Sequence, residues 1–104
     1  LVEKMNFNDK CFELISEVPK GKVTTYKEIA RVLNTKAYQA VGRAMAKNKK
    51  LVYISCHRVI KSDGKIGGYA MGINKKINLL QKEGISIING KVVDFTDKFY
   101  SFGN

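Results

Sequence analysis

A cysteine, a histidine and an arginine follow one another at positions 56–58 and could form a reactive thiol site. Only the thiolate of cysteine is a good nucleophile, and its ordinary pKa of about 8.5 leaves little of it at neutral pH. A helix N-terminus, the cation of Arg58, or His57 acting as a base could each increase the thiolate fraction. Buried cysteines and lone histidines are often purely structural. These residues alone therefore leave Cys56 as either a nucleophile or an inert core residue.

The other cysteine, Cys11, falls on the apolar face of a predicted helix and fits the inert interpretation. Two cysteines and one histidine cannot supply the four ligands of a structural zinc site, nor a disulfide scaffold. The glycine-rich segment at 64–72 lacks the Gly-Lys-Ser/Thr ending of a phosphate-binding loop. We therefore expect no metal and no cofactor.

The charge balance points to a polyanionic partner. Nineteen Lys and Arg residues against nine Asp and Glu give this chain of 104 residues a net charge of +10. Such an excess is typical of proteins that bind polyanions, and it favours nucleic acid over an anionic membrane or an acidic protein. No apolar run approaches the roughly 20 residues of a membrane span, and the first residues lack a secretory stretch. We expect no membrane association.

Three helices are predicted in the first half of the chain, over about 9–17, 26–33 and 36–47. Thr25 and Glu28 have the spacing of a capping box at the start of the second helix, in which each side chain bonds an amide of the helix end. The second and third helices, joined by a short turn, form a helix-turn-helix pattern. Its outward residues would face DNA, and these are Gln39, Arg43 and Lys47.

The second half predicts a small strand element. An apolar run at 51–54 predicts a buried strand just before Cys56, which would place the thiol at the rim of the core. A turn at 61–65, a helix over about 72–82 and a hairpin over 85–93 with an Asn89-Gly90 turn follow. Part of the tail should pack through its aromatic residues. We therefore predict an α+β fold that is mostly helical. Residues 1–104 would form a single winged helix-turn-helix-like DNA-binding domain.

Several segments resemble one protein family. The run Ser55-Cys56-His57-Arg58-Val59 resembles the Pro-Cys-His-Arg-Val signature of the O6-alkylguanine-DNA alkyltransferases, or methylated-DNA–protein-cysteine methyltransferases. The segments 24–30, 40–45 with Asn48, 62–69 and 79–84 are similar to that family in the same order and at matching spacing. The resemblance covers about 7–84 and implies the C-terminal, DNA-binding and active-site domain of the family.

The resemblance implies DNA repair by direct reversal of damage. The family binds duplex DNA through the minor groove, rotates an O6-alkylguanine out of the stack because a stacked base is out of reach, and transfers the alkyl group irreversibly to a cysteine. Each molecule would act once. We expect a monomer in the cytoplasm with the chromosomal DNA, or in the nucleus of a eukaryote.

The resemblance also assigns roles to residues. Cys56 would accept the alkyl group, His57 would act as base through a bridging water, and Glu83 would orient His57. Tyr26 would donate a hydrogen bond to the leaving guanine, and Asn48 would hold the turn between recognition helix and active site. The substrate pocket would comprise Val59, Tyr69, Ala70 and Lys76, and the DNA-binding set Thr25, Gln39, Arg43 and Lys47.

Finer roles follow from the same resemblance. The amide of Ala70 would approach O6, the carbonyls of Cys56 and Val59 would read the exocyclic amine of the guanine, and Lys76 would support the loop. Arg58 would be structural. All of this requires a hollow beside the Cys56 sulfur that a flipped base can enter.

The chain departs from the family pattern in three respects. Ser55 stands where the family usually has proline, and Gln39 where it has the arginine that fills the gap left by the flipped base. The sequence also holds no counterpart of the N-terminal domain of many members, so it is either a fragment or a naturally minimal version.

Other interpretations stay open. One is an alkyltransferase-like module that binds the lesion without transfer, against which the presence of Cys56 speaks. Another is a helix-turn-helix transcription factor, which would leave Cys56, His57 and Glu83 as coincidences. A cysteine hydrolase is disfavoured because no oxyanion hole is recognisable.

Overall fold

The computed structural model describes residues 6–46 and 55–103. The helices are α1 (Phe7–Ser16), α2 (Tyr26–Val32), α3 (Tyr38–Ala46), the 3-10 helix η2 (Cys56–Arg58), α4 (Ile73–Lys82) and α5 (Phe95–Lys98). The strands are β1 (Thr24–Thr25), β2 (Val59–Ile60), β3 (Ile87–Ile88) and β4 (Lys91–Val92). The four predicted helices are confirmed to within two residues at each end. The predicted strand at 51–54, Lys47 and Asn48 lie outside the described residues.

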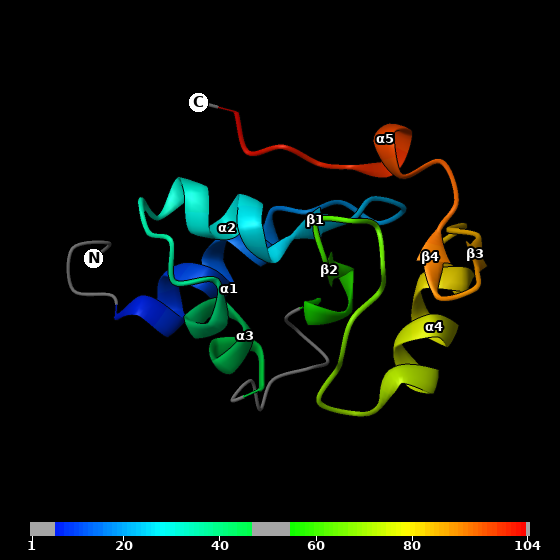
Figure 1. Ribbon diagram of the computed structural model, residues 1–104, viewed down its shortest axis with the longest axis horizontal. Helices are drawn as coiled ribbons and strands as arrows, with labels where there is room; N and C mark the ends of the chain where they lie inside the picture. Colours follow the sequence, from blue (N-terminus) through cyan, green and yellow to red (C-terminus); the bar gives the residue numbers. More distant parts are fainter. Residues whose placement is uncertain (1–5, 47–54, 104) are drawn as a thin grey trace.

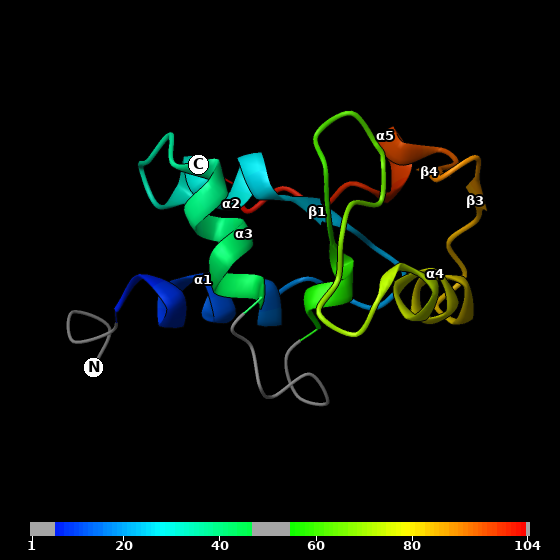
Figure 2. The same ribbon diagram turned by 60° about the horizontal axis from the view of Figure 1, so that its bottom comes forward.

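The helices α1, α2 and α3 pack together at one end of the molecule (Figure 1, Figure 2). Their buried face consists of small and aliphatic side chains, namely Cys11, Ile15, Ile29, Ala30, Val41 and Ala44. The turn between α2 and α3 contains Asn34 with a φ of 56°, a left-handed conformation that asparagine tolerates better than most residues. The predicted helix-turn-helix is therefore confirmed. Every helix in the described ranges is too short or too polar to span a bilayer.

The capping box predicted for α2 is only half formed. Thr25 Oγ1 accepts the backbone N–H of Glu28 at 3.0 Å, as predicted. The carboxylate of Glu28 instead accepts hydrogen bonds from Arg31 on its own helix and from the backbone N–H of Phe102 in the tail. Charge-assisted bonds from a guanidinium outcompete the single amide bond that a capping box would give this carboxylate.

Two short parallel strands join the two halves of the chain. Thr24 in β1 pairs with Val59 in β2, and Thr25 pairs with Ile60. Because adjacent strand residues point to opposite faces, Val59 packs in the helical core while Ile60 enters a second core with Val23, Ile66 and Leu80. The segment that begins with Cys56 therefore lies between two hydrophobic clusters, with α4 and the β3–β4 hairpin on its far side (Figure 1).

The C-terminal segments return to the first half of the chain. The predicted hairpin is confirmed, with Asn89 and Gly90 both at positive φ (53° and 75°), as a tight two-residue turn requires. After α5 the chain runs back beside β1, where Val23 N–H donates to Lys98 O at 2.9 Å and Tyr100 N–H donates to Val23 O at 2.7 Å. The predicted packing of the tail is thus confirmed, and Figure 1 shows the tail passing along α2.

Candidate active site

Cys56 opens the helix η2 and is nearly enclosed, with 3% of its surface exposed. It packs in the helical core together with Val59 and Cys11. Burial, and then the charge of Cys56, raises the pKa of the Cys11 thiol to about 11. Cys11 therefore stays protonated at neutral pH, which agrees with the inert role predicted for it.

Glu83, which ends α4, binds both residues that follow Cys56. His57 Nε2 lies 2.8 Å from Glu83 Oε2. Arg58 grips the same carboxylate with two bonds, from Nε to Oε1 at 2.9 Å and from Nη2 to Oε2 at 2.8 Å, and a third bond runs to the carbonyl of Val18. Burial raises the pKa of Glu83, but the hydrogen bonds from Arg58 and His57 outweigh burial and hold the pKa below its ordinary value. The prediction that Arg58 is structural agrees with these bonds.

The histidine ring is fixed in one protonation state by these neighbours. Burial lowers the pKa of His57 below 6.5, and the nearby cations of Arg58 and Lys76 lower it further, against the opposing effect of Glu83. The ring is therefore neutral at pH 7, and because a carboxylate only accepts, Nε2 carries the hydrogen. Nδ1 then holds a lone pair, and it is buried without a hydrogen-bond partner among the described residues. This nitrogen is available as a base.

Two tyrosines predicted for the site pack around the same cluster as Cys56. Burial raises the pKa of Tyr26 and of Tyr69, and a negative charge on Cys56 raises both further, so both phenols remain hydrogen-bond donors. The Tyr69 ring meets His57 edge to face, with ring centroids 6.4 Å apart. The structure therefore brings Cys56, His57, Tyr26 and Tyr69 to one place.

Lys76 is a fully buried cation beneath this cluster. Its Nζ donates to the carbonyls of Val59 at 2.7 Å and Gly68 at 2.9 Å, and lies 5.9 Å from the centroid of the Tyr26 ring. Burial lowers its pKa to about 8. The support that Lys76 was predicted to give the loop agrees with the bond to Gly68. The Val59 carbonyl, predicted to read the guanine amine, already accepts one hydrogen bond and keeps one lone pair for a second.

The remaining predicted residues lie around this centre or outside it. Gln39 and Arg43 are exposed on α3, and Ala70 is exposed in the turn after Tyr69. Thr25 is buried and its oxygen accepts the N–H of Glu28 as the cap of α2, and its hydroxyl hydrogen can still donate to a phosphate. No group of three or more potential metal ligands lies within the described ranges.

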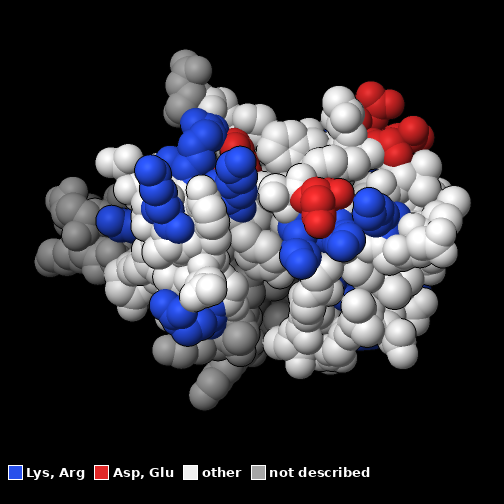
Figure 3. All heavy atoms as spheres, in the orientation of Figure 1, with Lys and Arg blue, Asp and Glu red and all other residues white. Residues whose placement is uncertain are grey.

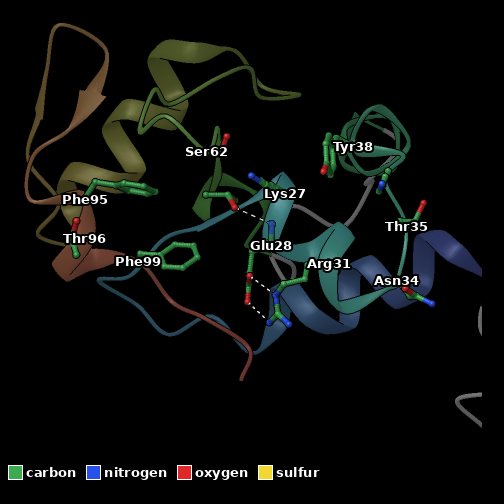
Figure 4. A pocket seen from close by; sticks show the side chains of 12 residues that line it. Lys27, Glu28, Arg31, Asn34, Thr35, Tyr38, Ser62, Phe95, Thr96 and Phe99 are labelled. Atoms are coloured by element: carbon green, nitrogen blue, oxygen red, sulfur yellow. Dashed lines mark hydrogen bonds and ion pairs between the residues drawn. The ribbon is translucent and has the colours of Figure 1, made fainter. Parts of the chain in front are cut away.

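A groove of about 720 Å³ opens on the outer side of α2. Its lining comes from α2, the start of α3, the turn after β2 and α5, and includes Thr25, Lys27, Lys36, Tyr38, Ser62 and Phe99 (Figure 4). Lys and Arg side chains gather on the same face, in one group over α2 and another over the segment that follows β2 (Figure 3). Sequence reasoning missed Lys27, Lys36 and Ser62, although their places at the start of predicted helices and in a turn are typical of phosphate contacts.

Cys56 does not line this groove. Tyr26 and Tyr69 are partly buried and pack against the cluster that contains Cys56. The hollow beside the sulfur that a flipped base would enter therefore stays a prediction.

The sequence matches known proteins over most of its length. It is 42% identical over 104 residues to a bifunctional methyltransferase/endonuclease of Picrophilus torridus, covering 99% of this chain and 34% of that protein. It is 45% identical to a methylated-DNA–protein-cysteine methyltransferase of Sulfolobus acidocaldarius and 47% identical to one of Saccharolobus solfataricus, covering 79% and 78% of this chain and 52% of each relative. The chain thus spans between a third and about half of the length of these relatives.

Solved structures share the fold. Schizosaccharomyces pombe Atl1 in complex with damaged DNA containing O6-carboxymethylguanine gives a TM-score of 0.80 at 29% identity, covering 91% of this chain and 94% of that one. The O6-methylguanine-DNA methyltransferase of Pyrococcus kodakaraensis gives 0.70 at 41%, covering 78% and 47%. Mycobacterium tuberculosis OGT in complex with DNA gives 0.73 at 36%, covering 77% and 49%.

The family description that matches is "6-O-methylguanine DNA methyltransferase, DNA binding domain", and it matches residues 6–85. That range holds the helix-turn-helix, η2, Lys76 and Glu83. The chain therefore belongs to the family of 6-O-methylguanine DNA methyltransferase DNA-binding domains.

Proposed function

We propose that this protein repairs duplex DNA by taking an alkyl group from O6 of a flipped guanine onto Cys56, once per molecule. The observation that carries the proposal is the state of His57: Nε2 is bound to Glu83 at 2.8 Å, while Nδ1 is buried with its lone pair unused among the described residues. Family membership and the relatives' names support the same reaction.

The atoms, protons and electron pairs of the transfer balance without a cofactor. His57 Nδ1 takes the thiol proton, directly or through a water, and the sulfur of Cys56 attacks the alkyl carbon. The new S–C bond forms as the C–O6 bond breaks, and the bonding electron pair leaves with the guanine. Tyr26 donates a hydrogen bond to this anionic leaving group, and the imidazolium of His57 returns a proton to give neutral guanine. Since the thioether is stable, the protein is not regenerated.

The buried environment favours this chemistry once the substrate is seated. Lys76 is close enough for its charge to interact with that of Cys56, and a cation in low-dielectric surroundings stabilises a thiolate. Because Cys56 is 3% exposed, we expect the groups that cover the sulfur to move when the base enters. We place this reaction with the chromosomal DNA, in the cytoplasm or in the nucleus of a eukaryote, and with the protein as a monomer.

Intact mass spectrometry after incubation with an oligonucleotide duplex holding one O6-methylguanine tests the proposal. We expect one added methyl group on the wild type and on Cys11→Ala, and none on Cys56→Ala. Cys11→Ala is the matched control because it removes the other buried cysteine of the same core. A wild type that stays unmodified while the lesion duplex is fully bound contradicts the proposal.

That last outcome would support a second candidate, a module that recognises the alkylated base without accepting the group. The observation that favours it is the fold: S. pombe Atl1 in complex with damaged DNA gives a TM-score of 0.80, against 0.70 and 0.73 for the two methyltransferases. Equal affinity for lesion and undamaged duplex, without modification, would instead support a transcription factor.

A further inference from the structure

The C-terminal segment 95–103 lies beyond the part of the chain that matches the family, yet the fold holds it firmly on α2. Tyr100 pairs with Val23 through its N–H, and its carbonyl accepts from Thr24 Oγ1 at 3.0 Å. Further along, Glu28 Oε2 accepts from Phe102 N–H at 2.9 Å and from Ser101 Oγ at 3.1 Å. The segment is therefore a fixed part of the surface.

Arg31 closes this attachment. Its guanidinium binds both oxygens of Glu28 and donates to the carbonyl of Gly103 at 2.6 Å. The bond from Arg31 is the main reason that the pKa of Glu28 falls to about 2, so the carboxylate is charged throughout the physiological range. The negative charge of Glu28 and the positive charge of Arg31 cancel locally. The lysines therefore determine the sign of the electrostatic potential in the groove beside them.

The attached segment forms one wall of the groove described above. Figure 4 shows Phe95, Thr96 and Phe99 on one side and Lys27 on the other. Lys36 also lines the groove, and within the described residues neither lysine forms an ion pair. Ammonium groups suit phosphates, while aromatic rings and hydroxyl groups suit sugars and bases.

We propose that α5 and the residue after it form a second DNA-contacting wall, so that a strand flanking the flipped guanine lies in the groove between α2 and α5. DNA is favoured over an acidic protein because the groove combines cations with aromatic rings, and because Thr25 in its lining adjoins Tyr26 of the active site. This inference rests on the proposed function only in taking duplex DNA as the partner. It adds a contact surface outside the family match.

Thr96 allows a direct test, because it is exposed on α5 and lines the groove. We expect Thr96→Glu to weaken binding to an undamaged 20-base-pair duplex about fivefold and to reduce the slope of log affinity against log salt by about one, while Thr96→Lys tightens binding. Ser86→Glu is the matched control, since Ser86 is exposed outside the groove and the charge change is the same. It should alter affinity less than twofold.

Equal effects of Thr96→Glu and Ser86→Glu, or no gain with Thr96→Lys, would overturn the inference. So would weaker binding to anionic phospholipid vesicles with unchanged binding to DNA, which would assign the groove to a membrane. Thr96→Lys keeps the test decisive if the glutamate variant fails to fold. Because undamaged duplex is the probe, the result is independent of methyl transfer to Cys56, and failure of one proposal is visible separately from failure of the other.

Discussion

Glu83 Oε2 lies 2.8 Å from His57 Nε2, and Arg58 donates two hydrogen bonds to the same carboxylate. The arginine fixes the carboxylate, and the carboxylate fixes the imidazole. The ring of His57 therefore cannot rotate, and its tautomer cannot change, without breaking a charge-assisted hydrogen bond. Among the side-chain nitrogens and oxygens of these three residues, Nδ1 alone is buried without a hydrogen-bond partner within the described part of the chain.

The substitution Glu83→Gln should slow alkyl transfer without weakening DNA binding. Glu83 raises the pKa of His57 against the effect of burial, so its loss lowers that pKa further and makes Nδ1 a weaker base. We expect the transfer rate at pH 7 to fall about 10- to 100-fold, less than the full contribution of a general base, because His57 itself is retained. Single-turnover kinetics from pH 5 to 9 would show the acidic limb of the profile moved to lower pH.

The control for this variant is Glu17→Gln, which removes an exposed carboxylate at the end of α1. Thermal melting of both variants separates lost folding from lost chemistry. A Glu83→Gln protein that melts lower but transfers at the wild-type rate would show that the carboxylate is only structural.

Replacing the buried lysine should cost stability as well as activity. Lys76→Met removes two hydrogen bonds and leaves the carbonyls of Val59 and Gly68 without their donor. We expect a loss of about 2–3 kcal/mol in the free energy of unfolding, measured in urea, because bonds to a charged group and buried acceptors are both involved. Lys75→Met, an exposed lysine of the same helix, should change it by less than about 0.5 kcal/mol.

The pH dependence of the free energy of unfolding, compared between the wild type and Lys76→Met, gives a second measurement. Burial lowers the pKa of Lys76 from 10.5 to about 8, so between these values the unfolded chain binds more protons than the folded one. Stability from this group therefore increases as pH rises through that window. The advantage of wild type over Lys76→Met should grow from pH 8 to pH 10, and an advantage that shrinks would contradict the assignment.

The attachment of the tail should be sensitive to acid through Glu28. The bond from Arg31 lowers the pKa of Glu28 from 4.5 to about 2, so the folded state releases its proton more readily than the unfolded chain. Because the Arg31 side chain is 44% exposed and solvent screens the pair, the resulting stability is about 2 kcal/mol; it is complete above pH 4.5 and lost as pH falls toward 2. Urea unfolding of Glu28→Gln between pH 2 and 6 should show a flatter acid limb than the exposed-site control Glu13→Gln. Parallel acid limbs in Glu28→Gln and Glu13→Gln would contradict this role of Glu28.

Local patterns in the sequence predict the helical part of the fold well. The apolar spacing of α1 to α4 is regular, and Asn89-Gly90 marks the hairpin turn. The pairing of β1 with β2 was not predicted, because two residues per strand give no periodicity and the partners lie 35 positions apart, as Thr24 and Val59. Such pairings are selected by the packing of the two cores.

The candidate site, like the fold, could be predicted only in part from the sequence. The resemblance to the family predicts Cys56, His57 and Glu83, and the structure joins the last two across 26 positions. The enclosure of the sulfur and the tail wall of the groove follow from tertiary packing alone. The Glu28 carboxylate shows the reason: its capping-box spacing predicts a bond to the helix end, but Arg31 and the amide of Phe102, 74 positions away, bind the same oxygens instead.

The substitution Gln39→Arg should tighten binding to duplex that contains the lesion. Gln39 is exposed on α3, at the place where the family has an arginine that fills the gap left by the flipped base. Glutamine can occupy that gap and bond the unpaired cytosine, but it carries no charge to hold a phosphate and stacks less well than a guanidinium. We expect about a fivefold gain for an O6-methylguanine duplex, measured by fluorescence anisotropy with Cys56→Ala to prevent transfer. In the same background, Ser16→Arg on the exposed side of α1 adds the same charge away from α3 and should give less than half of that gain. Unchanged affinity in Gln39→Arg would show that glutamine fills the gap as effectively as arginine.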